Sequence, residues 1–399
     1  MSTLKVDTIR HNSATSDAIT TAADGTCTAK LTSVGGGQLS HRNLIINGAF
    51  QVAQRGTDAT GVAANTYATV DRFKASQSGT DEYIEQHQVD VSSGTTPYTL
   101  GFRKAFQVKN GNQTSGAGAG DYVYIRTELE AQDIANSGWN YISASSYITL
   151  QFWVKSSVAQ NFYGYVRTID GTNYHYPFET GSLSADTWTK VTKTIPGNSN
   201  LQFNNNNGRG FQFTFLGLMG TDFTSSSATL NTWHATGSGD IYTPDNTTTW
   251  YTTNDATLEL TGVQLEVGDT ATSFEHRSYG EELARCLRYY ELIAERDEGS
   301  NSKENPIGLF WGDGSTSFTQ IFFKVKKRTQ PTLEISNYTN AFRHYGTGGG
   351  SNASTLTVNT LHRDGMLLQG GGNAGGSGFT RLFTTNNGLK ALVAASAEL

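Results

Sequence analysis

Aromatic side chains set among polar residues are the strongest binding signal in this sequence. Two pairs of tyrosines alternate at a spacing of two, and three further rings lie in polar segments. Flat rings with polar tips stack on sugar faces, while neighbouring Asn and Asp side chains bond to hydroxyls. Tyrosines at period two are equally typical of strand packing, so a structural role stays open. The candidate glycan-binding residues are Tyr163, Tyr165, Tyr174, Tyr176, Trp233, Trp250 and Tyr251.

Pairs of acidic residues are the second signal, because a glycosidase needs two carboxyl groups that face each other across a cleft. Glu128 and Glu130 fall on one face of a predicted strand over residues 122–130. Glu259 and Glu266 lie near the end of a long β-rich segment. The sequence does not place either pair across a cleft, and we favour solvated strand faces over catalysis for all four.

Familiar catalytic motifs are absent. The sequence has no phosphate-binding loop ending in Gly-Lys-Ser/Thr, no paired-histidine zinc motif and no Gly-x-Ser-x-Gly elbow. Residues 370–375 match a dinucleotide fingerprint by spacing, but no βαβ unit surrounds them, so we interpret them as a loop. We therefore predict that the chain is not an enzyme and has no catalytic residues and no cofactor.

A short basic run, formed by Lys324, Lys326, Lys327 and Arg328, has two interpretations. It is suited to contact with anionic polysaccharide or phosphate. Lysines at the end of a strand also discourage pairing between sheet edges, and we favour that role.

Composition indicates many short strands. Among 399 residues there are 44 glycines, 11% aromatic and only 16% charged residues, a mixture that suits strands joined by polar turns. The net charge of -6 argues against nucleic acid as a partner. Cys27 and Cys286 lie in segments of different character and imply no disulfide. No apolar run resembles a signal peptide or a membrane span, so we expect synthesis in a cytoplasm and no membrane insertion.

The first 43 residues are polar and small, and they cannot bury enough surface to fold alone. The alternation at Leu4 and Val6 favours a strand, with Ile9 as a further apolar position. The segment is either a floppy leader or an arm that docks on another chain by adding strand hydrogen bonds. As an arm, it would attach through Leu4, Val6 and Ile9.

Residues 44–277 show strand patterns throughout. In one of them, Phe211, Phe213 and Phe215 share one face and the polar residues between them share the other. Eight or so such strands, separated by Gly and Asn turns, predict a two-sheet sandwich of the jelly-roll kind. Residues 300–399 return to short strands and predict a small C-terminal β domain.

Between these segments, residues 278–299 predict one amphipathic helix. Ser278 and Glu281 form a capping box at its start. A narrow apolar stripe at heptad spacing suits a trimer seam, although a helix lying on its own domain explains it equally well. The proposed oligomerisation residues are Tyr279, Leu283, Cys286, Leu287, Tyr290 and Ile293.

Several of these segments resemble a module of tailed-phage virion proteins, which is frequent in tail fibres of marine and cyanobacterial phages. The segments are residues 43–56, Asp71 to Phe73, 260–268, 274–277 and 281–290. The first nine residues and the closing Ala395 to Leu399 resemble the two ends of cyanophage structural proteins.

The resemblance implies a location in the virion, attachment of residues 1–43 to other virion proteins, and a homotrimer. The middle segment is similar to carbohydrate-binding jelly rolls, which implies a sugar-binding face and, in some relatives, a structural calcium ion. The resemblance does not identify which residues of this chain would bind the sugar or the calcium ion.

Three functions follow from these observations. The first is a tail fibre that contacts host surface polysaccharide or lipopolysaccharide. The second is a purely structural virion protein, such as a head or tail decoration or an adaptor, whose exposed rings would contact neighbouring subunits. The third is a polysaccharide depolymerase. It is disfavoured because a β-helical spike would show a repeat of about 20 to 30 residues.

Overall fold

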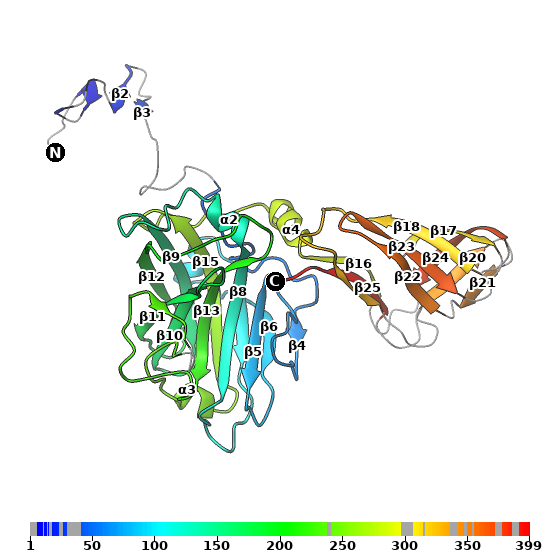
Figure 1. Ribbon diagram of the computed structural model, residues 1–399, viewed down its shortest axis with the longest axis horizontal. Coiled ribbons are helices and arrows are strands. Elements are labelled where there is room, and N and C mark those ends of the chain that lie inside the picture. Colours follow the sequence, from blue (N-terminus) through cyan, green and yellow to red (C-terminus); the bar gives the residue numbers. More distant parts are fainter. Residues whose placement is uncertain are drawn as a thin grey trace.

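The computed structural model is mainly β, as the composition predicts. It describes residues 41–237, 241–296, 306–313, 316–335, 342–346, 349–352, 355–371, 377–384 and 391–399, with short stretches between residues 6 and 29. Figure 1 shows a large sandwich with a smaller β unit attached at one side.

Residues 58–267 form a sandwich of two six-stranded antiparallel sheets. Sheet I has the order β14 (His234–Ala235), β11 (Tyr174–Ser182), β10 (Asn161–Thr168), β13 (Arg209–Met219), β8 (Tyr122–Glu130) and β5 (Phe73–Ser78). Sheet II has the order β12 (Thr189–Pro196), β9 (Tyr147–Ser156), β15 (Thr257–Val267), β7 (Lys104–Lys109), β6 (Glu85–Asp90) and β4 (Asp58–Ala59). Short helices in the connections are α1 (Thr96–Thr99), α2 (Ala131–Ala135) and α3 (Thr249–Thr252).

The core of the sandwich follows from the alternation of its strands. Phe211, Phe213 and Phe215 of β13 are fully buried between the sheets, as predicted. Phe152 of β9 meets Phe213 and Phe215 from the other sheet, with ring centroids 5.5 and 5.3 Å apart. Rings at this spacing bury large apolar surfaces against each other, which stabilises the sandwich.

The chain then forms α4 (Tyr279–Leu287) and a two-sheet C-terminal unit (Figure 1). A three-stranded sheet has the order β16 (Tyr290–Arg296), β25 (Ala391–Ser396) and β19 (Thr332–Ile335). The seven-stranded C-terminal sheet has the order β21 (Gly349–Asn352), β20 (Phe342–Gly346), β24 (Ser377–Thr384), β17 (Pro306–Asp313), β18 (Thr316–Phe322), β23 (Gly365–Gly371) and β22 (Thr355–Leu361). Apolar side chains from both sheets, including Phe310, Leu368 and Val393, form its core.

The predicted helix over 278–299 is wrong in its second half. Ser278 caps the helix, as expected, by accepting from the Glu281 backbone N–H, but α4 ends at Leu287. From Tyr290 the chain pairs with β25, a strand about a hundred residues away that the local pattern does not reveal. The heptad stripe therefore does not exist, because Tyr290 and Ile293 lie on a strand.

The proposed oligomerisation residues do not form a surface either. Cys286, Leu287 and Tyr290 are buried within this chain, and burial raises the pKa of the Cys286 thiol. Leu283 and Ile293 are half-buried. Tyr279 alone of the six is exposed, at 55%. Cys286, Leu287 and Tyr290 therefore pack within this chain and are not available for the seam that we proposed.

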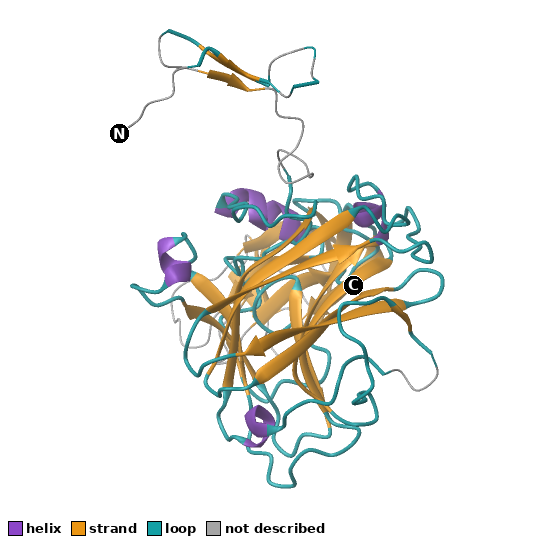
Figure 2. Cartoon of the chain, turned by 90° about the vertical axis from the view of Figure 1, so that its left-hand side faces the viewer, coloured by secondary structure: helices purple, strands orange, loops and turns teal. Residues whose placement is uncertain are grey.

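Near the N-terminus, β1 (Thr8–Ile9), β2 (Ile19–Thr21) and β3 (Cys27–Ala29) form a small sheet that lies apart from the sandwich (Figure 2). Val6 and Ile9 are 40% and 53% exposed, whereas Leu4 lies outside the described residues. Within the described part of the chain, no helix is long and apolar enough to span a bilayer.

Candidate functional site

One face of the C-terminal sheet carries large exposed side chains. Leu309 and Trp311 of β17 are 58% and 56% exposed, and Phe322 of β18 is 72% exposed. Trp311 pairs with Phe318, and Gln320 pairs with Leu367, so these side chains share one face. The opposite face packs into the core. We call the exposed side the C-terminal face; it includes Leu309, Trp311, Phe318, Gln320, Phe322, Thr360 and Leu367.

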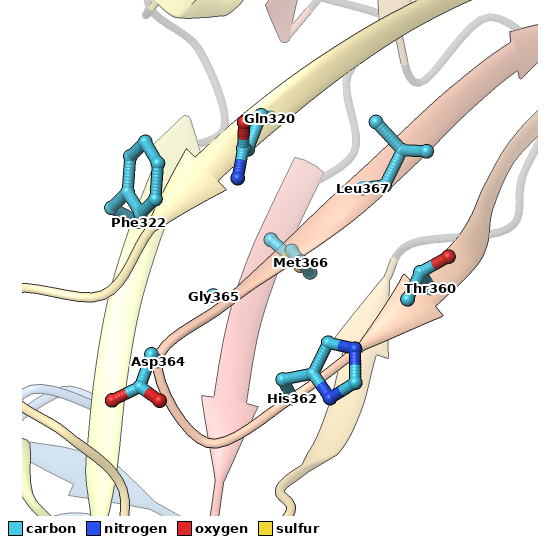
Figure 3. Close-up of a pocket in the computed structure, with 8 residues that line it drawn as sticks. All are labelled: Gln320, Phe322, Thr360, His362, Asp364, Gly365, Met366 and Leu367. Atoms are coloured by element: carbon cyan, nitrogen blue, oxygen red, sulfur yellow. The ribbon is translucent and has the colours of Figure 1, made fainter.

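At one end of this face lies a groove of about 450 Å³, the C-terminal groove. Figure 3 shows Phe322 on β18 and His362 after β22 on either side of Gly365. A Cβ at Gly365 would lie 2.4 Å from the Ile321 carbonyl oxygen, so this position has no room for a side chain beside β18. The complete lining is Gln320, Phe322, Thr360, His362, Asp364, Gly365, Met366 and Leu367.

Backbone hydrogen bonds fix both walls of the groove. The turn that carries His362 and Asp364 closes with a bond from His362 N–H to the Gly365 carbonyl, 2.9 Å long. The Phe323 N–H donates to the Asp364 carbonyl at 3.0 Å, which ties this turn to the end of β18. Phe322 and the turn are therefore held opposite each other before any ligand arrives, which lowers the entropic cost of binding.

The groove suits a sugar ring. An exposed phenyl ring such as Phe322 stacks on the apolar face of a pyranose. Carboxylate, imidazole, amide and hydroxyl groups from Asp364, His362, Gln320 and Thr360 surround it and can bond to hydroxyls. Asp364 has an exposed ion pair with Lys326 at 3.2 Å, which is weak enough for a ligand to replace.

Sequence reasoning missed these residues. The sequence predicts short strands over 300–399, but the segment from Phe318 to Phe323 has apolar side chains at both alternating positions, so alternation does not say which of them are exposed. Exposure of Phe322 depends on the pairing of β18 with β23, which places Gly365 beside it.

Five of the seven predicted glycan-binding residues are wrong because they are buried. Trp250 and Tyr251 have no exposed surface; they belong to α3, which packs into the sandwich core. Trp233 is 8% exposed, and its indole N–H donates to the Pro196 carbonyl at 2.7 Å. Tyr165 and Tyr176 are 1% and 3% exposed. None of these rings can stack on a sugar.

The two remaining tyrosines do not form a site together. Tyr163 packs with Tyr165 on the outer face of sheet I, under a loop that carries Tyr242. Tyr174 packs with Tyr176 against the core on the inner face. Both Tyr163 and Tyr174 are half-buried. The period-two spacing reflects strand packing, which was the alternative interpretation.

The four carboxylates are buried and not solvated. Glu130 is fully buried and accepts two hydrogen bonds from Arg288 and one from Tyr289, each 2.7 Å long. Burial opposes its ionisation, but these bonds outweigh it and hold the pKa of Glu130 below its usual value. Glu128 pairs with Lys74 at 3.2 Å.

The second pair of carboxylates is buried as well. Glu259 pairs with Lys155 at 2.9 Å, and Glu266 accepts bonds from Thr272. All four carboxyl groups therefore already have protein partners, and the solvated strand faces that we expected are wrong.

The basic run lies in a loop, residues 323–331, that follows the end of β18. The role of protecting a sheet edge, which we favoured, is wrong because β18 is paired with both β17 and β23. Lys327 is fully buried, with its ammonium 2.6 Å from Glu291. Arg328 donates to the carbonyls of Ala397, Glu398 and Asn207. Arg328 thus joins the C-terminal unit to the sandwich, whereas Lys327 bonds to Glu291 of β16 and to the Leu287 carbonyl of α4. The glycine segment at 370–375 lies partly outside the described residues.

Four of the segments that resemble phage virion proteins, those with Arg55, Arg72, Tyr289 and Glu398, meet at one place, which we call the junction. It lies where α4, β16 and the last residues, Ala397 to Leu399, contact the sandwich. Arg72 lies 3.5 Å from the Tyr289 ring centroid and donates to Glu398. Arg55 lies 3.5 Å from the Tyr290 ring centroid and also meets Glu398. The junction side chains bond to one another, so their role is to hold the two units together.

No metal site is visible in the described part of the chain, where no three His, Cys, Asp or Glu groups lie together. The structural calcium ion implied by the resemblance stays a prediction.

Comparisons with known proteins give only weak likenesses. No family model and no curated protein matches the sequence. Tailspike protein 4 of bacteriophage CBA120, in its enzymatically active domain, is 10% identical with a TM-score of 0.30; the match covers 56% of this chain and 21% of that one.

Two carbohydrate-binding structures are similar at the same level. A CBM4 structure is 12% identical with a TM-score of 0.27, over 56% of this chain and 99% of its own. The CBM22 tandem domain of Paenibacillus barcinonensis Xyn10C is 9% identical with a TM-score of 0.28, over 92% of this chain and all of its own. Likenesses this weak leave function to be argued from the side chains of this chain.

Proposed function

We propose that this chain is a phage virion appendage, a tail fibre, that attaches through residues 1–43 and contacts host surface glycans through the C-terminal groove. The observation that carries the glycan part is the 72% exposed ring of Phe322, opposite a turn with His362 and Asp364. An exposed ring beside convergent polar groups is the usual chemistry of sugar recognition.

The C-terminal face offers room for more than one sugar unit. Phe318 and Phe322 are four residues apart on β18, about 13 Å at the rise of a strand. Trp311 lies across from Phe318 on the neighbouring strand. A host polysaccharide lying along β18 could therefore meet the groove and then this second ring.

The test uses the full chain and purified host polysaccharide or lipopolysaccharide. Phe322→Ala removes the stacking ring, and we expect binding to weaken about tenfold or more, since a good ring contact is worth about 1.4 kcal/mol. Tyr83→Ala is the matched control, because Tyr83 is 54% exposed and does not line the groove. Equal binding by both variants and the unchanged chain would contradict the proposal.

A purely structural virion protein is the second candidate, and the same face supports it. Leu309 and Trp311 lie outside the groove and are more than half exposed, as expected of rings and alkyl groups that neighbouring subunits cover. Glycan binding that survives every substitution on this face, together with assembly that does not, would favour this function.

The remaining parts of the proposal rest on the resemblance. The exposed Val6 and Ile9 suit an arm that docks on another virion protein, and deletion of residues 1–29 should prevent incorporation into particles. The apolar helical stripe that suggested a trimer is not present in the structure, so the trimer needs its own test. The mass of the full chain in solution measures the oligomeric state directly.

The buried carboxylates described above do not support a polysaccharide depolymerase. Release of reducing ends from host polysaccharide would show that the chain is one.

A further inference from the structure

A second cavity, of about 320 Å³, opens on the outer face of sheet II. We call it the sandwich pocket. Gln151 and Trp153 of β9 reach it from one strand, and Lys190 of β12 from the next. Lys190 and Trp153 are direct cross-strand partners, so their side chains stand next to each other on this face. None of the three was among the predicted glycan-binding residues.

Aromatic rings close one side of the sandwich pocket. Phe102 and Phe274 meet edge to face with centroids 4.9 Å apart, and His276 lies 5.1 and 4.9 Å from them. The Phe102 ring lies over Gly262, whose φ of +64° and missing side chain leave room for it. The His276 Nε2 lies 2.9 Å from the Leu100 carbonyl, which fixes the imidazole.

Buried polar residues hold the wall that carries Phe274. Glu266 accepts from the Thr272 N–H at 2.9 Å and from its hydroxyl at 2.6 Å. The Gln264 carbonyl oxygen accepts from the Glu275 N–H at 2.8 Å, and the Gln151 amide donates to the Thr272 carbonyl at 2.7 Å. The pocket is therefore formed before a ligand binds.

Three polar side chains lie at the sandwich pocket. Lys190 is exposed and has no ion pair within the described residues. Trp153 is half-buried, and no acceptor among the described residues bonds to its indole N–H. Gln151 is only 3% exposed, and its amide N–H is fixed by the bond to the Thr272 carbonyl. An ammonium, an indole and an amide at one pocket are groups that can bond to an anion and to hydroxyls.

We infer that the sandwich pocket binds a sugar ring that carries a negative charge, either a carboxylate or a phosphate. The ring stacks on Trp153, the anion meets the Lys190 ammonium, and a hydroxyl donates to the Gln151 carbonyl. This site goes beyond the proposed function, because it stands whether or not the C-terminal groove binds a glycan.

The test measures binding of galacturonic acid, galactose 6-phosphate and galactose to the full chain by calorimetry. We expect at least one anionic sugar to bind about tenfold more tightly than galactose, the size of one charge-assisted hydrogen bond. The sugar acid and the sugar phosphate separate the two sources of charge. Lys190→Gln should remove the preference for the anion, and Trp153→Ala should weaken binding of all three sugars.

Two controls keep the inference open to refutation. Lys324→Gln removes an exposed lysine without an ion pair in the described chain, and it should change nothing. Phe322→Ala should leave binding of the anionic sugars intact; if it abolishes that binding, the site is the C-terminal groove and the inference fails. Equal affinity for galactose and both anionic sugars, or unchanged preference in Lys190→Gln, would also overturn it.

Discussion

The junction and the C-terminal groove use polar side chains in opposite ways. At the junction, Glu130, Arg72 and Tyr289 are buried, and they and their neighbours bond to one another. At the groove, His362 and Asp364 are exposed and line an open space. The junction carries most of the segments that resemble phage virion proteins, whereas the groove carries none. The recognisable residues of this chain build its frame, and the proposed binding residues lie elsewhere.

Backbone conformation makes the same distinction. Asn47, Phe50 and Arg72, all in segments that carry the resemblance, have φ values of 61°, 54° and 69°. A non-glycine residue in this region costs free energy and persists only where its surroundings hold it. At Asn47 the side chain donates to the carbonyls of Val52 and Asp71, at 2.8 and 2.9 Å. The junction thus depends on particular residue types.

The largest effect that we predict is at the junction. Glu130→Gln leaves Arg288 partly buried without its charged partner, and we expect a loss of about 3 to 5 kcal/mol in the free energy of unfolding. Denaturation in urea measures it. Asp90→Asn is the control, since Asp90 pairs with Lys104 at 2.7 Å but is 82% exposed, and it should cost about 1 kcal/mol or less. Similar losses of unfolding free energy in both variants would show that the buried and the exposed ion pairs contribute equally to stability, which contradicts this prediction.

A glycine of the resembling segments tests the frame of the sandwich pocket. A Cβ at Gly262 would lie 2.6 Å from the Phe102 ring, so Gly262→Ala should cost about 1 to 3 kcal/mol more than an open glycine at similar φ. Gly61→Ala is that control, because Gly61 has φ +60° and no atom within 4 Å of the added carbon. Melting temperatures compare the two; an equal fall would show that Phe102 moves aside freely.

The pH dependence of stability is a second test of the junction. Burial raises the pKa of Asp71 to about 6, against a usual value of 3.8. The folded state therefore binds a proton that the unfolded state does not between these values. This contribution to stability is complete at low pH and is lost as the pH rises through about 6.

Comparison with Asp71→Asn isolates that contribution. The stability of the unchanged chain relative to Asp71→Asn should be greater at pH 5 than at pH 8, as measured by melting temperature at both values. A difference that does not vary with pH would mean that Asp71 titrates at its ordinary pKa.

The smallest effect on stability should come from the groove. Phe322→Ala removes a ring that is 72% exposed, and we expect the free energy of unfolding to change by about 0.5 kcal/mol or less. The same variant should lose glycan binding. A large loss of stability would show that Phe322 stabilises the fold, as the junction residues do, and would contradict the prediction.

The sequence predicts local features of this fold well. Alternation identified the buried face of β13, and the Ser278 cap identified the start of α4. The sequence could not predict the end of α4, because Tyr290 begins a strand and pairs with Ser396, more than a hundred residues later. Periodicity reports local preference and cannot show such a pairing.

The binding residues were harder to predict for a related reason. Trp250 lies in a polar segment, yet its ring packs against Gly217 and is fully buried. Tyr165 lies on the outer face of sheet I, but Tyr242 stacks on it with centroids 5.0 Å apart. Whether a ring is covered depends on loops that come from elsewhere in the chain, and the sequence around the ring does not contain that information.

Electron cryomicroscopy of the intact virion tests the central claim most directly. The account predicts that the C-terminal face, with Phe322 and Trp311, projects from the particle and is uncovered, while residues 1–43 contact another virion protein. A C-terminal face covered by neighbouring subunits would contradict a glycan-binding tail fibre and leave a structural virion protein.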